Sequence, residues 1–146
     1  MFDHLHNQAL DRQLVDHEGR KDRLYIDTTG HATIGVGHNL SVKPVKDHII
    51  AEWFEEDKAE AIHDLITAFP WVVALDPVRQ RVLVDMTFNL GIGGLKAFAP
   101  TLALVQAGDY AGAAARLRKT LWFRQTKRRA KALIDMLETG RDPFSG

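Results

Sequence analysis

Apolar side chains near the start of the chain recur at helical spacing. Leu10 and Leu14 are four residues apart, and Glu18 follows at the same interval. This pattern predicts a helix over residues 7–17 with Glu18 at the end of its apolar stripe. Gly19 suits the position just past a helix end. A carboxyl group there is predicted to be partly desolvated and near the negative end of the helix dipole, and both effects favour the protonated form that a general acid needs.

The next stretch alternates between apolar and polar positions, as strands do. Residues 24–27 and 32–37 follow this pattern and are joined by a turn that begins at Asp27. If the apolar residues of both strands share one face, Asp27 and Thr33 share the other face, which is predicted to be open. The glycines of the second strand leave room there for a bulky ligand. The segment therefore predicts two carboxylates, a hydroxyl and free space close together.

Helical periodicity dominates the rest of the chain. A long helix is predicted over residues 46–68, and a second, strongly apolar helix begins after Asp76 with Pro77 in its first turn. A cluster of glycines is predicted to end this second helix: Gly91, Gly93 and Gly94. Shorter helices are predicted over residues 101–106, 109–120 and 126–138. The predicted fold class is α+β, mostly helical, with a small antiparallel sheet near the amino terminus.

Length and composition limit the classes of protein to consider. A chain of 146 residues is long enough for one domain with a sizeable core. The absence of cysteine excludes a disulfide framework and a thiolate metal site, and the scattered histidines predict no metal site. The formal net charge of zero indicates no class of partner. No apolar run predicts a Sec signal peptide or a stable membrane insertion.

The segment around the two carboxylates resembles the active-site region of the phage-type lysozymes, the family of T-even phage lysozyme and glycoside hydrolase family 24. The family pattern is Glu, eight residues, Asp, five residues and Thr, followed by I-G-x-G-H. This chain has Glu18, Asp27 and Thr33 at those spacings, then the sequence I-G-V-G-H. Later stretches resemble the family in the same order along nearly the whole chain: Phe88-Asn89-Leu90-Gly91, Phe98, Trp122-Phe123-Arg124-Gln125-Thr126, Arg129-Ala130-Lys131 and Thr139-Gly140.

The resemblance implies a single lysozyme-like domain with two lobes. It also implies an ion pair between His38 and Asp57 that holds the sheet to the long helix, although two separate surface groups remain an alternative. The implied parts of the domain, residues 1–146, are an N-terminal lobe over residues 16–50, a linking helix over residues 46–68, and a C-terminal lobe over residues 71–142 that also includes the N-terminal helix.

The function that the resemblance implies is that of an endolysin, which releases phage progeny by lysing the host. It would hydrolyse the β-1,4 bond between N-acetylmuramic acid and N-acetylglucosamine in peptidoglycan without a cofactor. Glu18 would protonate the leaving oxygen, Asp27 would position a water, and Thr33 would help to hold that water. The family inverts stereochemistry, which predicts carboxyl groups about 6.5–9.5 Å apart. Further substrate contacts are implied at six positions, of which the first and fifth differ in residue type from the best-known family member: Asn39, Phe88, Asn89, Thr101, Arg116 and Arg129.

The resemblance also implies a setting for the enzyme. It would act as a monomer on the glycan strand, accumulate in the host cytoplasm, and reach the periplasmic wall after a separate holin permeabilises the membrane. Residues 116–131 carry eight basic residues and no acidic one, which is typical of a polyanion site or of a solvated helix face. We favour the solvated face and no nucleic-acid partner, because the resemblance assigns Arg129 to the cleft.

Other functions remain open at this stage. A lytic transglycosylase would cut the same bond with Glu18, but it would form an anhydro sugar and would not need Asp27 or Thr33. A catalytically silent wall-binding module of a virion would need none of the three residues. A nucleic-acid binder would depend on the basic segment and would show strongly salt-dependent binding.

Overall fold

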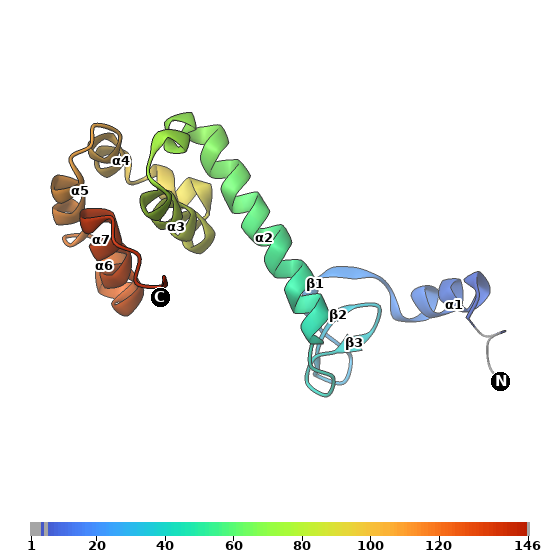
Figure 1. Ribbon diagram of the computed structural model, residues 1–146. Coiled ribbons are helices and arrows are strands. Elements are labelled where there is room, and N and C mark those ends of the chain that lie inside the picture. Colours follow the sequence, from blue (N-terminus) through green and yellow to red (C-terminus); the bar gives the residue numbers. More distant parts are fainter. Residues whose placement is uncertain (1–3, 5, 146) are drawn as a thin grey trace. The chain divides into compact units, whose positions relative to one another are not determined.

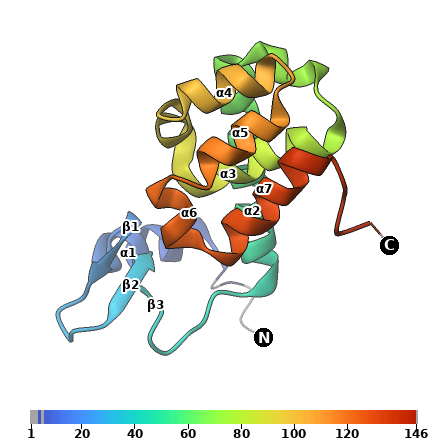
Figure 2. The ribbon, with the colours of Figure 1, turned by 90° about the vertical axis from the view of Figure 1, so that its left-hand side faces the viewer.

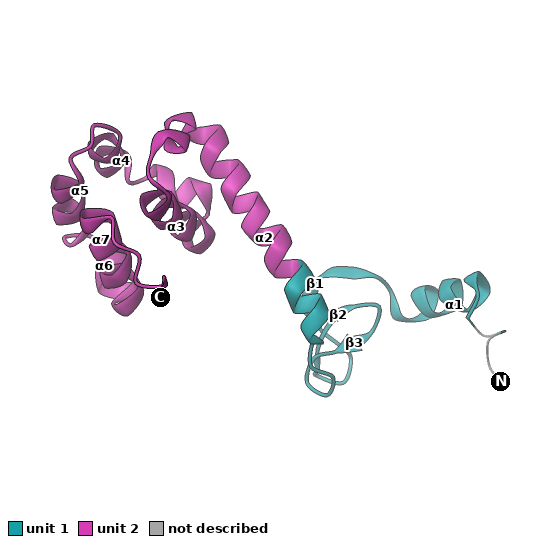
Figure 3. Cartoon of the chain, viewed as in Figure 1, with its two compact units in different colours: residues 1–52 teal, residues 53–146 magenta. Residues whose placement is uncertain are grey.

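The computed structural model describes residue 4 and residues 6–145 (Figure 1). The remaining residues, 1–3, 5 and 146, lie outside this description, and the expectation of no signal peptide falls partly on them. The chain divides into two compact units, Met1–Glu52 (unit 1) and Trp53–Gly146 (unit 2), which Figure 3 colours separately. Helices and one small antiparallel sheet make up the described elements, which confirms the predicted α+β class.

Unit 1 begins with the predicted helix. Helix α1 (Gln8–Glu18) starts after Asn7, whose side chain accepts hydrogen bonds from the backbone N–H groups of Ala9 and Leu10. It ends at Gly19, whose φ of 76° lies in the region that L side chains rarely adopt. None of the residues of α1 is buried. The boundaries were thus predictable from capping and from the glycine, but the burial of an apolar stripe was not confirmed.

The sheet of unit 1 has three strands in the order β1-β2-β3, all antiparallel. They are β1 (Lys21–Ile26), β2 (Ala32–Gly35) and β3 (His38–Asn39). The sequence predicted the first two strands but not the third, because two residues are too few for an alternating pattern. Thr33 pairs with Tyr25 on one side and with Asn39 on the other. Since paired residues point to the same face of a sheet, these three side chains share a face.

Unit 2 is helical, and Figures 1 and 2 show its helices from two sides. Helix α2 (Asp47–Ala68) starts in the range of unit 1 and matches the predicted long helix. The helices that follow are the 3-10 helix η2 (Pro70–Ala74), α3 (Pro77–Lys96), α4 (Ala99–Gln106), α5 (Tyr110–Leu117), α6 (Leu121–Thr126) and α7 (Arg128–Thr139). Asp76 caps α3 by accepting a hydrogen bond from the backbone N–H of Arg79 at 3.1 Å, as its place before Pro77 predicted. The short helix α6 was not predicted.

The glycines of α3 act differently from the prediction that they end the helix. The helix breaks at Gly91, where φ is 71°, and then resumes as far as Lys96. Gly94 lies in this second part, and a Cβ atom there would lie only 2.8 Å from the Cβ of Leu90. Gly91 therefore forms the kink, whereas Gly94 leaves room for the side chain of Leu90.

The core of unit 2 is built around α3, as its apolar sequence predicted. Val82, Leu83 and Met86 of α3 are each at most 2% exposed. Trp122 of α6 packs edge-on against Phe98 with ring centroids 6.2 Å apart. Other fully buried side chains of the unit come from α2, α4, α5 and α7: Leu65, Val105, Leu117, Ile134 and Leu137. Within the described part of the chain no single helix has the length and hydropathy to cross a membrane, and only α3 and α4 together do, across a bend of 110°.

The C-terminal segment of unit 2 is fastened by one carboxylate. The guanidinium group of Arg81 donates two hydrogen bonds to Asp142, at 2.6 and 2.8 Å, and the backbone N–H of Phe144 donates a third at 2.9 Å. These bonds, those from Arg81 first, lower the pKa of Asp142 from 3.8 to about 2. The ionised carboxylate is therefore the form that holds the segment.

Replacing Asp142 with Asn is expected to destabilise the fold slightly near neutral pH and less at low pH. The folded-state pKa of Asp142 is depressed, so its stabilisation is complete above about pH 4 and is lost as the pH falls toward 2. Thermal unfolding of both proteins at pH 7 and at pH 2 measures this difference. A gap between the two melting temperatures that is as large at pH 2 as at pH 7 would contradict the assignment.

Candidate active site

Glu18 is the last residue of α1, and its carboxylate lies against the turn between β2 and β3. A Cβ atom built on Gly37 would lie 2.6 Å from Oε2 of Glu18. The side chain is exposed. The sequence predicted partial desolvation here, but α1 buries none of its residues, so unit 1 by itself does not provide that desolvation.

Asp27 begins the turn between β1 and β2, as predicted, and uses one carboxylate oxygen to hold it. Oδ1 accepts hydrogen bonds from the backbone N–H of His31 at 2.8 Å, from the Thr29 hydroxyl at 2.8 Å and from the Thr29 backbone N–H at 2.9 Å. These bonds, that from the His31 backbone first, lower the pKa of Asp27. Among the described residues nothing donates a hydrogen bond to Oδ2. The turn therefore keeps Asp27 ionised and leaves one oxygen available to a water or a ligand.

Thr33 occupies the middle of β2 and is only 2% exposed. Its hydroxyl donates a hydrogen bond to the backbone carbonyl of His31 at 2.9 Å. The register supports the prediction that Thr33 points to the face on which the β1–β2 turn carries Asp27, but the prediction that this face is open at Thr33 was wrong. Because its proton is already engaged, Thr33 can meet a water only as a hydrogen-bond acceptor.

His31 belongs to the same turn and was not predicted as a site residue. Its Nδ1 lies 2.7 Å from the Thr29 hydroxyl and 3.8 Å from Oδ1 of Asp27. The spacing Asp-x-Thr-x-His around a turn is the signal that could have indicated this cluster, because an Asp at the start of a turn bonds to groups two and four residues later. His31 thus helps to hold Asp27 in place, through its backbone N–H and through the contact of its ring with Thr29.

Asn39 and His38 form β3 and complete the described part of the site in unit 1. The Asn39 side chain accepts a hydrogen bond from the backbone N–H of Ser41 at 2.9 Å, and Nε2 of His38 lies 2.8 Å from the carbonyl of Lys43. Asp57 belongs to unit 2, so its ion pair with His38 remains a prediction. Within unit 1 the structure brings Glu18 to the turn that leads into this strand.

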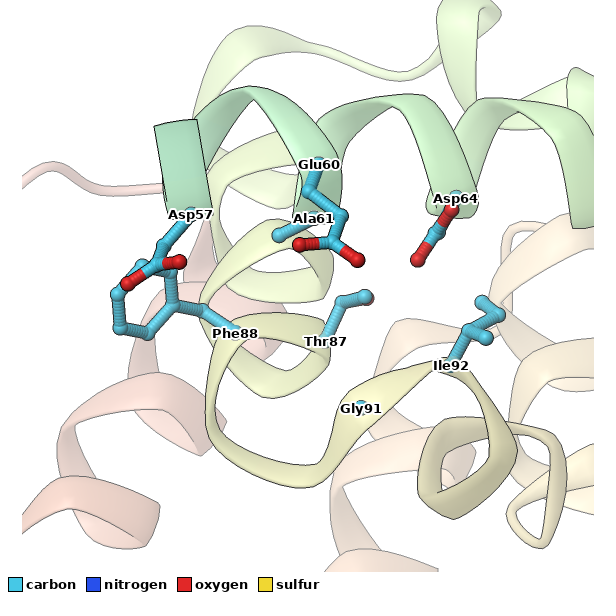
Figure 4. A pocket seen from close by; sticks show the side chains of 8 residues that line it. All are labelled: Asp57, Glu60, Ala61, Asp64, Thr87, Phe88, Gly91 and Ile92. Atoms are coloured by element: carbon cyan, nitrogen blue, oxygen red, sulfur yellow. The ribbon is translucent and has the colours of Figure 1, made fainter. Parts of the chain in front are cut away.

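In unit 2, a pocket of about 260 Å³ lies between α2 and α3. Figure 4 shows Glu60 and Asp64 of α2 opposite Thr87 and Ile92 of α3. Asp57 and Phe88 line the same pocket. Phe88 is 43% exposed and packs against Phe54 with ring centroids 6.3 Å apart, so it has surface available for a ligand. The complete lining is Asp57, Glu60, Ala61, Asp64, Thr87, Phe88, Gly91 and Ile92.

The other predicted substrate contacts also lie in unit 2, in different surroundings. Arg129 donates a hydrogen bond from Nε to Oδ1 of Asp85 at 2.7 Å, and it lines a groove of about 550 Å³ that Phe88 also lines. Asn89 is exposed and accepts a hydrogen bond from the Trp122 indole at 3.2 Å. Thr101 is buried, and Arg116 is exposed. The structure thus brings Phe88 and Arg129 to one groove and leaves little surface on Thr101.

Comparisons with known proteins agree with the sequence pattern. The family model described as "Phage lysozyme" matches residues 15–136. The pre-baseplate central spike protein Gp5 of Enterobacteria phage T4 is 29% identical over an alignment of 162 positions, which covers 92% of this chain and 28% of that protein. The probable T4-type lysozyme 2 of Dictyostelium discoideum is 28% identical over an alignment of 152 positions, which covers 84% of this chain and 89% of that protein. The peptidoglycan hydrolase gp36 of Pseudomonas phage phiKMV is 25% identical over 129 residues, or 84% of this chain and 14% of that protein.

Proposed function

Because this chain belongs to the phage lysozyme family, we propose that it hydrolyses the β-1,4 bond between N-acetylmuramic acid and N-acetylglucosamine in bacterial peptidoglycan. The family match over residues 15–136 is the observation that carries the proposal, since it includes the three predicted catalytic residues. The names of the T4-type lysozyme and of the peptidoglycan hydrolase support the coarser statement, an enzyme that lyses peptidoglycan.

Glu18 acts in this proposal as the general acid. It donates a proton to the oxygen of the glycosidic bond as that bond breaks, which prevents an unfavourable alkoxide from leaving. Glu18 is exposed in unit 1, so its carboxyl group can reach the glycosidic oxygen of a glycan bound beside it. The position of Glu18 at the end of α1 and against a glycine leaves its outer side accessible to a sugar.

Asp27 acts as the base that activates a water. Its lowered pKa keeps it ionised at the pH of the reaction, and its free Oδ2 can accept a proton from that water. The negative charge also stabilises the positive charge that develops on the sugar ring. Thr33 accepts a hydrogen bond from the same water, which fits its engaged hydroxyl proton. Attack by a water on the face opposite the leaving group inverts the configuration at the sugar carbon.

The muropeptides released from purified peptidoglycan test the reaction directly. The proposal predicts fragments with a reducing N-acetylmuramic acid end, each heavier by one water than an anhydro fragment. Mass spectrometry of the digest separates the two products. Anhydro fragments from the purified protein would indicate a lytic transglycosylase, and an unchanged wall would indicate a binding module.

The setting of the reaction has two candidates. In the first, the protein is an endolysin that acts as a monomer, accumulates in the host cytoplasm, and reaches the wall after a holin permeabilises the membrane. The similarity to a phage spike protein favours a second, in which the enzyme is carried on the virion and opens the wall during entry. Immunodetection in purified virions separates the two, because an endolysin is found in the lysate and is absent from the particles.

A further inference from the structure

Gly37 makes an unusually close approach to the carboxyl group of Glu18. A Cβ atom on Gly37 would lie 2.6 Å from Oε2, 2.9 Å from Cδ and 3.1 Å from Cγ of Glu18. Carbon atoms that are not bonded normally stay about 3.5–4.0 Å apart. The end of the Glu18 side chain therefore occupies the space that any other residue at position 37 would fill with its own side chain.

The other described glycines of unit 1 do not share this feature. Gly19, Gly30 and Gly35 also have positive φ, of 76°, 84° and 70°, but a Cβ atom on each would meet nothing within 4 Å. Their backbone conformation alone explains them. Gly37, with φ of 63°, has a second reason to be glycine, which is the contact with Glu18. The sequence had predicted that Gly35 and Gly37 make room for a ligand, but at Gly37 the side chain of Glu18 occupies that room.

We propose that Gly37 is a positioning residue for Glu18, which rests on the proposed function of Glu18 as the acid. The bare backbone of the β2–β3 turn forms a surface on which the carboxyl group lies, and it thereby selects one side-chain conformation. An alanine would push the carboxyl group away by about 1 Å to restore normal contact distances. Because a glutamate end moves easily, the main consequence is a misplaced acid rather than an unfolded protein. A misplacement of this size costs roughly 100-fold in rate.

Replacing Gly37 with Ala is therefore expected to lower kcat about 100-fold with little change in KM. Gly108→Ala is the matched control, because Gly108 has φ of 83°, lies between α4 and α5, and has nothing within 4 Å of a built Cβ atom. Both variants strain the backbone at one positive φ, so both lose similar stability in thermal unfolding. Only Gly37→Ala is expected to lose kcat.

The position of the carboxyl group can be followed without activity. The ¹³C resonance of the Glu18 carboxyl carbon is expected to move in Gly37→Ala and to stay in place in Gly108→Ala. A Gly37→Ala enzyme with a displaced resonance and full kcat would overturn the inference, and so would one that loses kcat with the resonance unmoved. A wild-type protein that fails to cut purified peptidoglycan would overturn the proposed function first, and these outcomes are therefore distinguishable.

Discussion

Replacing Glu18 with Gln is expected to reduce peptidoglycan cleavage by about 10²–10⁴-fold, enough to abolish visible wall clearing. The amide has nearly the same shape as the carboxyl group and fits against Gly37, but it has no acidic proton to give to the leaving oxygen. Stability should change little, because Glu18 is exposed and among the described residues takes part in no side-chain hydrogen bond or ion pair. The decrease in turbidity of a wall suspension measures activity, and thermal unfolding measures stability.

Glu52→Gln is the control for this variant. Glu52 is also an exposed glutamate of unit 1, lies in α2, and is not a predicted site residue. The Glu52→Gln variant loses one negative charge from the same unit, as Glu18→Gln does, and it is expected to retain full activity. A Glu18→Gln protein as active as the Glu52→Gln control would remove Glu18 as the acid.

Substitutions of Asp27 are expected to have the next largest effect, and they separate its charge from its role in the turn. Asp27→Ala removes both, and it should lower activity by about 10²–10³-fold and also destabilise unit 1, because three donors lose their shared acceptor. Asp27→Asn keeps an acceptor oxygen for those donors but loses the charge, so it should retain most of the stability and little of the activity. Asp27→Glu keeps the charge and should lose less activity than Asp27→Ala.

The pH dependence gives Asp27 an independent test. Its folded-state pKa is below its ordinary value, so the stabilisation that it provides is complete above the unfolded pKa of 3.8 and is lost as the pH falls through the lower folded value. The stability difference between wild type and Asp27→Ala should therefore shrink in acid. Unfolding curves measured over this pH range test the stability difference, and activity assays on the same proteins test the catalytic role of Asp27. Equal activity in the wild type and in all the Asp27 variants would mean that Asp27 is only a turn residue.

Local signals predicted much of the fold. Asp76 and Gly19 stand where a cap and a stop were expected, and each has the hydrogen bond or the conformation that its residue type favours. The turn that starts at Asp27 was predictable for the same reason, because Asp bonds to the backbone a few residues ahead. These features depend on neighbours in sequence and need no tertiary information.

Features that depend on packing could not be predicted in this way. Strand β3 has two residues, and α6 is a single short helix, so neither produces a periodic pattern. The burial of Thr33 follows from its place between Tyr25 and Asn39 in the middle strand, which alternation of apolar residues does not reveal. At Gly91, where φ is 71°, the helix breaks and then resumes, and the glycine cluster in the sequence does not distinguish such a break from a helix end.

The candidate site was predicted through its motif, and the structure adds the contacts that explain the motif. Glu18 and Asp27 stand at the ends of a helix and a strand, as the pattern indicated. The clearance at Gly37 and the support from His31 depend on distances between atoms that no spacing rule gives. The ion pair of His38 with Asp57 and the substrate contacts of unit 2 remain predictions.

The configuration of the first product formed tests the central claim most directly. If Glu18 protonates the leaving oxygen while Asp27 directs a water to the opposite face, cleavage of a β-linked glycan must release the α-anomer first. Time-resolved proton NMR of a soluble peptidoglycan oligomer, recorded before the anomers equilibrate, shows which anomer appears. Initial formation of the α-anomer is the predicted result; initial formation of the β-anomer, or of an anhydro sugar with no reducing end, would contradict the account.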